Sequence, residues 1–322
     1  MKKLCLILVL SIFIVSLGFG GTIFAKMIRI GVTQIVSHPA LNADEKGFEA
    51  ALKDAGFIEG KNVVYDRQNA QGDMTNAQTI ARKFVDEKVD LIHAIATPTA
   101  QAVVKVAKKI PVVYSSVTDP VDAGLVPTMG PSGTNVTGVS DAWPIEKQIK
   151  LYVEMLPKAK KWGTIYNAGD ANSLVNIKKT KAAMKKFNRK LVEVTVSSSS
   201  ELYQAAQSLV GKVDAIYITS DNTAVSGFEA IAKVCNQNKI PLFAGDVDSV
   251  SRGAIAALGF NYYDVGYAAG KKAAMILKGK KPGEIPSGYA EKLNLHLSLV
   301  NAKKQDVKIA QKFIKQAAKI YK

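Results

Sequence analysis

Two kinds of hydrophobic pattern alternate along the chain from residue 27 onward. Short runs of β-branched and aliphatic residues, typical of buried strands, are separated by stretches in which apolar residues recur every three or four positions, as in amphipathic helices. In the first half, strands are expected at residues 28–33, 62–67, 90–96, 111–117 and 135–139. Helices are expected between them at residues 40–55, 76–87 and 99–108. This alternation predicts an α/β fold with parallel strands.

The second half repeats the order of the first. Strands are expected at residues 162–167, 190–196, 214–219, 241–244 and 254–258. Helices are expected at residues 145–156, 173–187, 200–210 and 224–237. Residues 89–97 resemble residues 213–221, and residues 109–114 resemble residues 239–244. The repeat predicts two similar parallel-sheet lobes whose strand ends face each other across a cleft.

The chain is expected to pass between the lobes more than once. Lobe 1 is expected to contain residues 26–141 and about 261–288, and lobe 2 residues 142–260 and about 289–322. After residue 258 the pattern predicts a helix ending near residues 277–279, a strand at 293–299 and a terminal helix. The first crossing is expected near residues 140–144, and the others within 244–261 and 284–294. Several linkers predict a multi-strand hinge.

The first 25 residues have the pattern of an export signal. Lys2 and Lys3 precede an apolar run over residues 4–19, and small residues follow up to Ala25. The alternative, a membrane anchor, is disfavoured because this run is shorter than the roughly 20 residues that span a bilayer. We expect cleavage near Ala25 and localisation in the periplasm or another extracytoplasmic space. Cys5 lies at the start of the apolar run, which favours a free protein over a lipid-tethered one.

Composition narrows the possible partners. The chain carries 43 Lys and Arg against 27 Asp and Glu, a net charge of +16. Its arginines are few and scattered and its lysines follow helical spacing, as at residues 178–186, so we interpret them as solvated helix faces. Nucleic acid is not expected as a partner, because no aromatic residues are interleaved with arginine. After loss of Cys5, Cys235 remains alone and no internal disulfide can form.

Polar residues of the first half follow its strands, and ligands of parallel sheets bind at such carboxyl ends. Thr97, Pro98 and Thr99 open a helix, whose N-terminal N–H groups and dipole attract anions. Ser115 and Ser116 add hydroxyl donors at the end of the neighbouring strand. Lobe 1 is therefore predicted to bind an anion, most simply a carboxylate.

The corresponding positions of the second half carry acceptors. Asp221 and Asp246 follow strands of lobe 2, with Asn167, Asp170 and Asn222 nearby. These side chains suit an ammonium group. A ligand that spans both lobes would then be a zwitterion, most simply an amino acid.

Three candidate site residues have structural alternatives that the sequence leaves open. Thr97 and Asp221 immediately precede helices, where Thr and Asp are preferred N-caps. Trp143 lies at the first crossing, where it either walls the cleft or packs against the linker.

Enzymatic functions receive no support from the motifs. His38, His93 and His296 are widely separated, so no metal site is expected. The chain lacks a nucleophile elbow, a dinucleotide-binding glycine motif and a phosphate loop, so neither catalysis nor a cofactor is expected.

Seven segments resemble one known family. They are GFIEGKNV at 56–63, IPVV at 110–113, TDPV at 118–121, GLV at 124–126, NVTGVSD at 135–141, YYDVG at 262–266 and LKG at 277–279. Together they cover nearly the whole chain after residue 25. They are similar to the substrate-binding proteins of ABC importers of the tryptophan/tyrosine type, relatives of the type I periplasmic binding proteins.

The resemblance implies a two-lobed receptor that closes on an amino acid, often aromatic (Trp, Tyr or Phe), and then docks on a membrane permease. By motif position it implies that six residues face the cleft, namely Thr97, Ser116, Asp141, Asn167, Asp221 and Asp246. The alternatives are a sensor that presents its closed form to a receptor kinase, and a binder of sugars or other small solutes.

Overall fold

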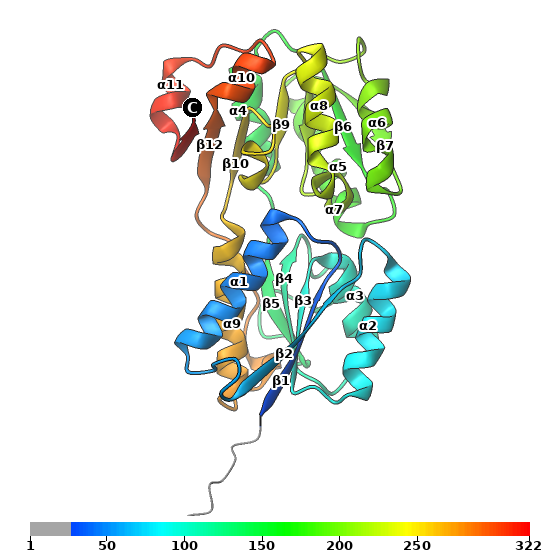
Figure 1. Cartoon of the computed structure of the whole chain (residues 1–322), viewed down its shortest axis with the longest axis vertical. Coiled ribbons are helices and arrows are strands. Elements are labelled where there is room, and N and C mark those ends of the chain that lie inside the picture. Colours follow the sequence, from blue (N-terminus) through cyan, green and yellow to red (C-terminus); the bar gives the residue numbers. More distant parts are fainter. Residues whose placement is uncertain (1–26) are drawn as a thin grey trace, which may run out of the picture.

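The computed structural model of the chain describes residues 27–322. The expected export signal, residues 1–25, lies outside these residues. No helix in the described part combines the length and the apolar character needed to cross a membrane. The chain forms two lobes, stacked along the long axis of the molecule (Figure 1).

Lobe 1 is built on a six-stranded sheet in the order β11-β5-β4-β3-β1-β2, in which all neighbours run parallel. The strands are β1 (Ile28–Gln34), β2 (Val63–Asn69), β3 (Leu91–Ile95), β4 (Val112–Val117), β5 (Val136–Ser140) and β11 (Gly288–Tyr289). The helices are α1 (Pro39–Asp54), α2 (Met74–Asp86), α3 (Thr97–Val106) and α9 (Tyr262–Leu277). Every residue of β3 and β4 is buried, as expected for central strands of a covered parallel sheet.

Lobe 2 has a seven-stranded sheet in the order β13-β12-β10-β9-β8-β6-β7. Its strands are β6 (Lys161–Tyr166), β7 (Lys190–Thr195), β8 (Ala215–Ile218), β9 (Leu242–Ala244), β10 (Ala256–Gly259), β12 (Asn294–Ser298) and β13 (Lys319–Tyr321). All neighbours are parallel except β10 and β12. The helices are α4 (Ile145–Met155), α5 (Ala171–Lys186), α6 (Leu202–Ser208), α7 (Asn222–Ser226), α8 (Phe228–Asn238), α10 (Leu299–Lys304) and α11 (Gln311–Gln316).

The predicted α/β class with two parallel-sheet lobes is confirmed, and three details differ. The helix expected at 224–237 is divided into α7 and α8 at Gly227, where an added Cβ would lie 2.6 Å from Leu202 Cδ1. The expected terminal helix is two short helices followed by β13, and the two-residue strand β11 was not anticipated. Short edge strands carry too few residues to produce a hydrophobic pattern.

Three segments connect the lobes: residues 141–144 between β5 and α4, 260–261 between β10 and α9, and 290–293 between β11 and β12. The first two are held together by an aromatic contact. Trp143 stacks on Phe260 with ring centroids 4.4 Å apart, and Tyr262 lies against both rings. This aromatic cluster joins the first two segments at the hinge.

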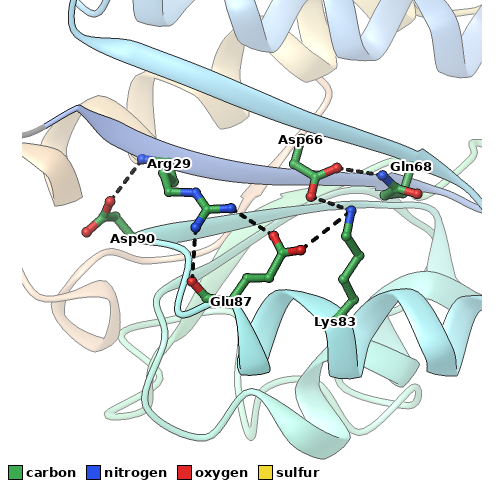
Figure 2. A network of polar contacts seen from close by, with 6 residues as sticks. All are labelled: Arg29, Asp66, Gln68, Lys83, Glu87 and Asp90. Atoms are coloured by element: carbon green, nitrogen blue, oxygen red, sulfur yellow. Dashed lines mark hydrogen bonds and ion pairs between the residues drawn. The ribbon is translucent and has the colours of Figure 1, made fainter.

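A polar network on lobe 1 lies near the start of β1 and β3 (Figure 2). Arg29 pairs with Glu87 at 2.8 Å, and Lys83 pairs with Asp66 at 2.6 Å. The backbone N–H of Arg29 also donates to Asp90. The network connects β1, β2 and α2, but because its side chains are partly exposed we expect each pair to stabilise the lobe by less than about 1 kcal/mol.

Helices α1 and α9 pack with almost no side chains between them. A Cβ added at Gly266 would lie 1.8 Å from the carbonyl oxygen of Asp44, and one added at Gly47 would lie 2.0 Å from that of Tyr263. Two glycines therefore bring the helix backbones into contact. The position of α1, and of every side chain it carries toward the cleft, depends on this contact.

The substitution Gly266→Ala tests this contact. Alanine is the better helix former by about 1 kcal/mol, but its methyl group would push α1 away, and overpacking costs about 1–3 kcal/mol or more at such short range. We expect the melting temperature, followed by circular dichroism, to fall by several degrees. The control is Gly130→Ala, whose Cβ meets no atom nearer than 3.7 Å. A Gly266→Ala variant as stable as the control would contradict the packing described here.

Candidate ligand-binding site

A cavity lies between the lobes at the carboxyl ends of the central strands. Its free volume is about 10 Å³, room for about one water molecule. Lobe 1 and lobe 2 each contribute five lining residues, and two more lie at the hinge: Asp141 of the first connecting segment, and Tyr262, the first residue of α9. The lobe residues are His38, Ala40, Leu41, Ser116 and Thr118 from lobe 1, and Asn172, Ser220, Asn222, Val225 and Asp246 from lobe 2.

Asp141 connects the cavity to the hinge. It follows β5, and its carboxylate accepts hydrogen bonds from the Tyr262 hydroxyl at 2.8 Å and the Thr118 hydroxyl at 3.3 Å. Burial raises its pKa to about 6, although both hydrogen bonds lower it. A positive group beside Asp141 would compensate this desolvation at the first connecting segment.

Asp246 follows β9 and provides the lobe 2 carboxylate of the cavity. It accepts hydrogen bonds from the backbone N–H of Ser249 at 2.8 Å and from its hydroxyl at 2.7 Å. Burial raises its pKa, and the Ser249 hydrogen bonds act in the opposite direction. Each carboxylate oxygen accepts only one of these bonds, so lone pairs remain for a ligand.

Asp44 is a functional candidate that sequence reasoning missed. It lies on α1 and is fully buried, and it accepts hydrogen bonds from the hydroxyls of Ser115, at 2.7 Å, and Ser116. The Ser115 hydroxyl also contacts His93 Nε2 at 2.7 Å. Desolvation by burial raises the pKa of Asp44 to about 7, against the effect of both serine hydrogen bonds. Its signal in the sequence is a carboxylate on the apolar stripe that includes Leu41 and Phe48.

This carboxylate corrects the expected role of two predicted site residues. Ser115 and Ser116 were expected to offer free hydroxyls to an anion, but both hydroxyls already donate hydrogen bonds to the carboxylate of Asp44. Ser116 still lines the cavity, in a left-handed backbone conformation with φ of 54°. Asp44 is fully buried and lines neither cavity, but Asp141 at the end of β5 brings a carboxylate to the cleft, so the expected separation of charge types between the lobes does not hold.

The helix expected to bind an anion reaches neither this cavity nor a second one that lies beside it between the lobes. Thr97, Pro98 and Thr99 are buried in the first turn of α3 and line neither one. The Thr99 hydroxyl donates to the carbonyls of Ile95 and Ala96, so it is occupied by its own helix. The helix N-terminus that does line the cavity is that of α1, at Ala40 and Leu41.

Two open alternatives are resolved by the contacts. Asp221 acts as a helix cap: it accepts from the N–H of Ala224 at 2.6 Å, the N–H of Asn167 at 2.8 Å and the Ser173 hydroxyl at 2.5 Å, and it lines neither cavity. Trp143 packs against Phe260 in the hinge and does not line the cavity.

The remaining predicted residues border a second cavity, with a free volume of about 110 Å³. Asn167 and Asp170 line only this one, whereas Asn222 lines both, so the two cavities are neighbours. Ile35, Val36, Gln71 and Gly72 form its lobe 1 side.

Asn172 and His38 are further lining residues that the sequence analysis did not select. The side-chain oxygen of Asn172 is buried and has no hydrogen-bond partner, so it is an acceptor available to a ligand. His38 caps α1, with its Nδ1 accepting from the N–H of Leu41, and burial lowers its pKa to about 3. His38 is therefore neutral at physiological pH.

The chemistry of the two cavities suits recognition of a cation. No Lys or Arg lines either of them in the described part of the chain. Within residues 27–322, no group of three His, Cys, Asp or Glu side chains is arranged to hold a metal ion. The cavities offer carboxylate and amide oxygens together with the N-terminus of one long helix.

The comparison with known proteins assigns the chain to a family. The model of the ABC transporter substrate binding protein family matches residues 29–321. This chain belongs to that family. The resemblance noted in the sequence is thereby confirmed. The chain is also 47% identical over 261 residues to a protein named "Tyrosine-binding protein" from Clostridioides difficile, with 81% of this chain and 76% of the relative covered.

Two solved structures show how the lobes of this substrate-binding protein are arranged. A domain in complex with L-Trp from Streptococcus pneumonia matches with a TM-score of 0.87 at 31% identity, covering 92% of this chain and 100% of that one. The ligand-free, open structure of a substrate-binding protein with adhesive properties from Clostridium difficile matches with a TM-score of only 0.68, at 38% identity and coverage of 92% and 99%. The arrangement of the lobes is therefore more similar to that of the complex, although the sequence is closer to that of the open protein.

The buried carboxyl of Asp44 predicts a pH dependence of stability. Because its pKa is about 7 in the folded protein and ordinarily 3.8, the folded state binds the proton more tightly than the unfolded state. Its contribution to the free energy of unfolding is therefore largest at low pH and falls as pH rises from about 4 to about 7. Relative to Asp44→Asn, the wild type should lose roughly 4 kcal/mol across this range. Urea denaturation at several pH values measures the difference, and a constant difference would contradict the burial of this charge.

Proposed function

We propose that this substrate-binding protein binds an aromatic amino acid between its lobes and delivers it to the permease of an ABC importer on the outer side of the cytoplasmic membrane. The observation that carries the ligand assignment is the pair of carboxylates, Asp141 and Asp246, that reach one cavity from the hinge and from lobe 2, while no lysine or arginine lines that cavity. Two desolvated carboxylates create a site for a positive group.

The ammonium group of the amino acid would neutralise this site. Asp246 and Asp141 provide charge, and the unpartnered oxygen of Asn172 provides a third acceptor. Three acceptors match the three N–H bonds of an ammonium group. Since these acceptors belong to the hinge and to lobe 2, the ligand would hold the lobes together.

The carboxylate of the amino acid would face the N-terminus of α1. The N–H of Leu41 donates to His38 and that of Asn42 donates to the carbonyl of His38, which leaves the N–H of Ala40 for a ligand. Ala40 lines the same cavity, and the dipole of this 16-residue helix favours negative charge there. The proposed anion site thus lies on lobe 1, as the sequence suggested, but on α1 rather than α3.

The aromatic side chain is supported by the relatives and by the second cavity. One relative is named a tyrosine-binding protein, and one solved structure holds L-Trp. Ile35 and Val36 give the second cavity an apolar side on which a ring can rest. A ligand that reaches this cavity would contact both lobes and favour the closed form through its differential affinity.

Calorimetry with Tyr, Trp and Phe tests this function. We expect binding by the protein that begins at Met27, and a ten- to hundredfold (roughly 1.5–3 kcal/mol) weaker affinity in Asp246→Asn, because a charged hydrogen bond to the ammonium group is lost.

The control for Asp246→Asn is Asp248→Asn. It removes the same charge from the same turn, but Asp248 lines neither cavity, so its affinity should stay within about twofold of the wild type. Equal weakening by both substitutions would refute the ammonium site, and absence of binding by the wild type would refute the ligand class.

A further inference from the structure

The second cavity has the composition expected for the far end of an aromatic side chain. On one side it offers the apolar side chains of Ile35 and Val36. On the other it offers hydroxyl and amide groups and one carboxylate, that of Asp170. Asn222 connects it to the cavity in which we place the ammonium and carboxylate groups. A ligand whose charged end occupies the first cavity would extend its side chain into the second.

Asp170 is unusual among the aspartates that begin helices. Asp73 caps α2 with hydrogen bonds at 2.6 and 3.0 Å, and Asp221 caps α7 with one at 2.6 Å. Asp170 has the same position at the start of α5, but its side chain makes no capping bond. Instead it lines the second cavity. Its carboxylate is therefore not used by the helix that it begins.

The carboxylate of Asp170 is also short of hydrogen-bond donors. Its one side-chain contact is the amide of Asn222, at the long distance of 3.5 Å. Burial, together with the nearby charge of Asp221, raises its pKa to about 6. Burying most of a carboxylate that has only one weak hydrogen-bond partner costs free energy. A hydrogen-bond donor on the ligand would lower that cost.

We propose that Asp170 accepts a hydrogen bond from the ring of the ligand, so that the site selects aromatic amino acids bearing a ring donor, the phenol O–H of Tyr or the indole N–H of Trp, over Phe. This inference rests on the proposed function and names the side chain that the cleft selects. Phe would place an apolar ring edge against the carboxylate and leave it without its donor. Discrimination of this kind is stronger than that of a purely apolar pocket.

Calorimetry with Tyr, Trp and Phe on three proteins tests the role of Asp170. In the wild type starting at Met27 we expect Tyr or Trp to bind about ten- to a hundredfold tighter than Phe. In Asp170→Ala the ratio should fall to within about threefold, mainly through weaker binding of the ligand with the ring donor. Asp248→Asn, which removes a nearby charge of lobe 2 that lines neither cavity, should keep the wild-type ratio.

The outcomes separate this inference from the proposed function. If the wild type binds aromatic amino acids but does not prefer ring donors, or if Asp170→Ala keeps the preference or weakens all three ligands equally, the role of Asp170 is refuted and the function stands. If no aromatic amino acid binds, both are refuted. Asp170 makes no capping bond, so we expect Asp170→Ala to fold. Asp170→Asn, which keeps the shape of the side chain, provides the same comparison if it does not.

Discussion

The buried carboxylate of Asp44 is the constraint on which the architecture of lobe 1 depends. Helix α1 contacts α9 backbone to backbone on one side, and on the other it inserts this charge beside the end of β4. The cost of burying the charge is offset only while both serine hydroxyls point at it. The same contacts fix the first turn of α1 at the cleft and hold Ser116 in its left-handed conformation. The binding surface of lobe 1 thus rests on an interaction within its own core.

The sequence predicts the fold well because the fold depends on periodic patterns. The buried runs of β3 and β4 and the three- and four-residue spacing of α1 are visible without a structure, and the internal repeat gives the two lobes. The pattern is weaker where an element is very short. β11 has two residues and β13 has three, and neither length allows an alternation to be recognised.

The site was harder to predict because the identity of a polar residue does not say which partner it will find. Asp221 and Asp246 both follow strands of lobe 2. Asp221 accepts hydrogen bonds from three donors of the protein, whereas Asp246 lines the cavity. Ser115 and Ser116 lie near the carboxyl end of β4 as expected, but a carboxylate 72 positions earlier than Ser116 accepts hydrogen bonds from their hydroxyls. Such pairings join distant parts of the chain and leave no local pattern. Asp44 itself was detectable only as a charge on an apolar helix face.

The glycine that ends β10 has a consequence for how the molecule moves. An added Cβ at Gly259 would lie 2.6 Å from the ring of Trp143, inside the aromatic cluster that joins two of the connecting segments. A larger residue there would act as a wedge in the hinge, although Gly259 itself lines neither cavity. A substitution at this one position would thus shift the equilibrium between the open and closed conformations. Affinity can therefore change without any change in the residues that contact the ligand.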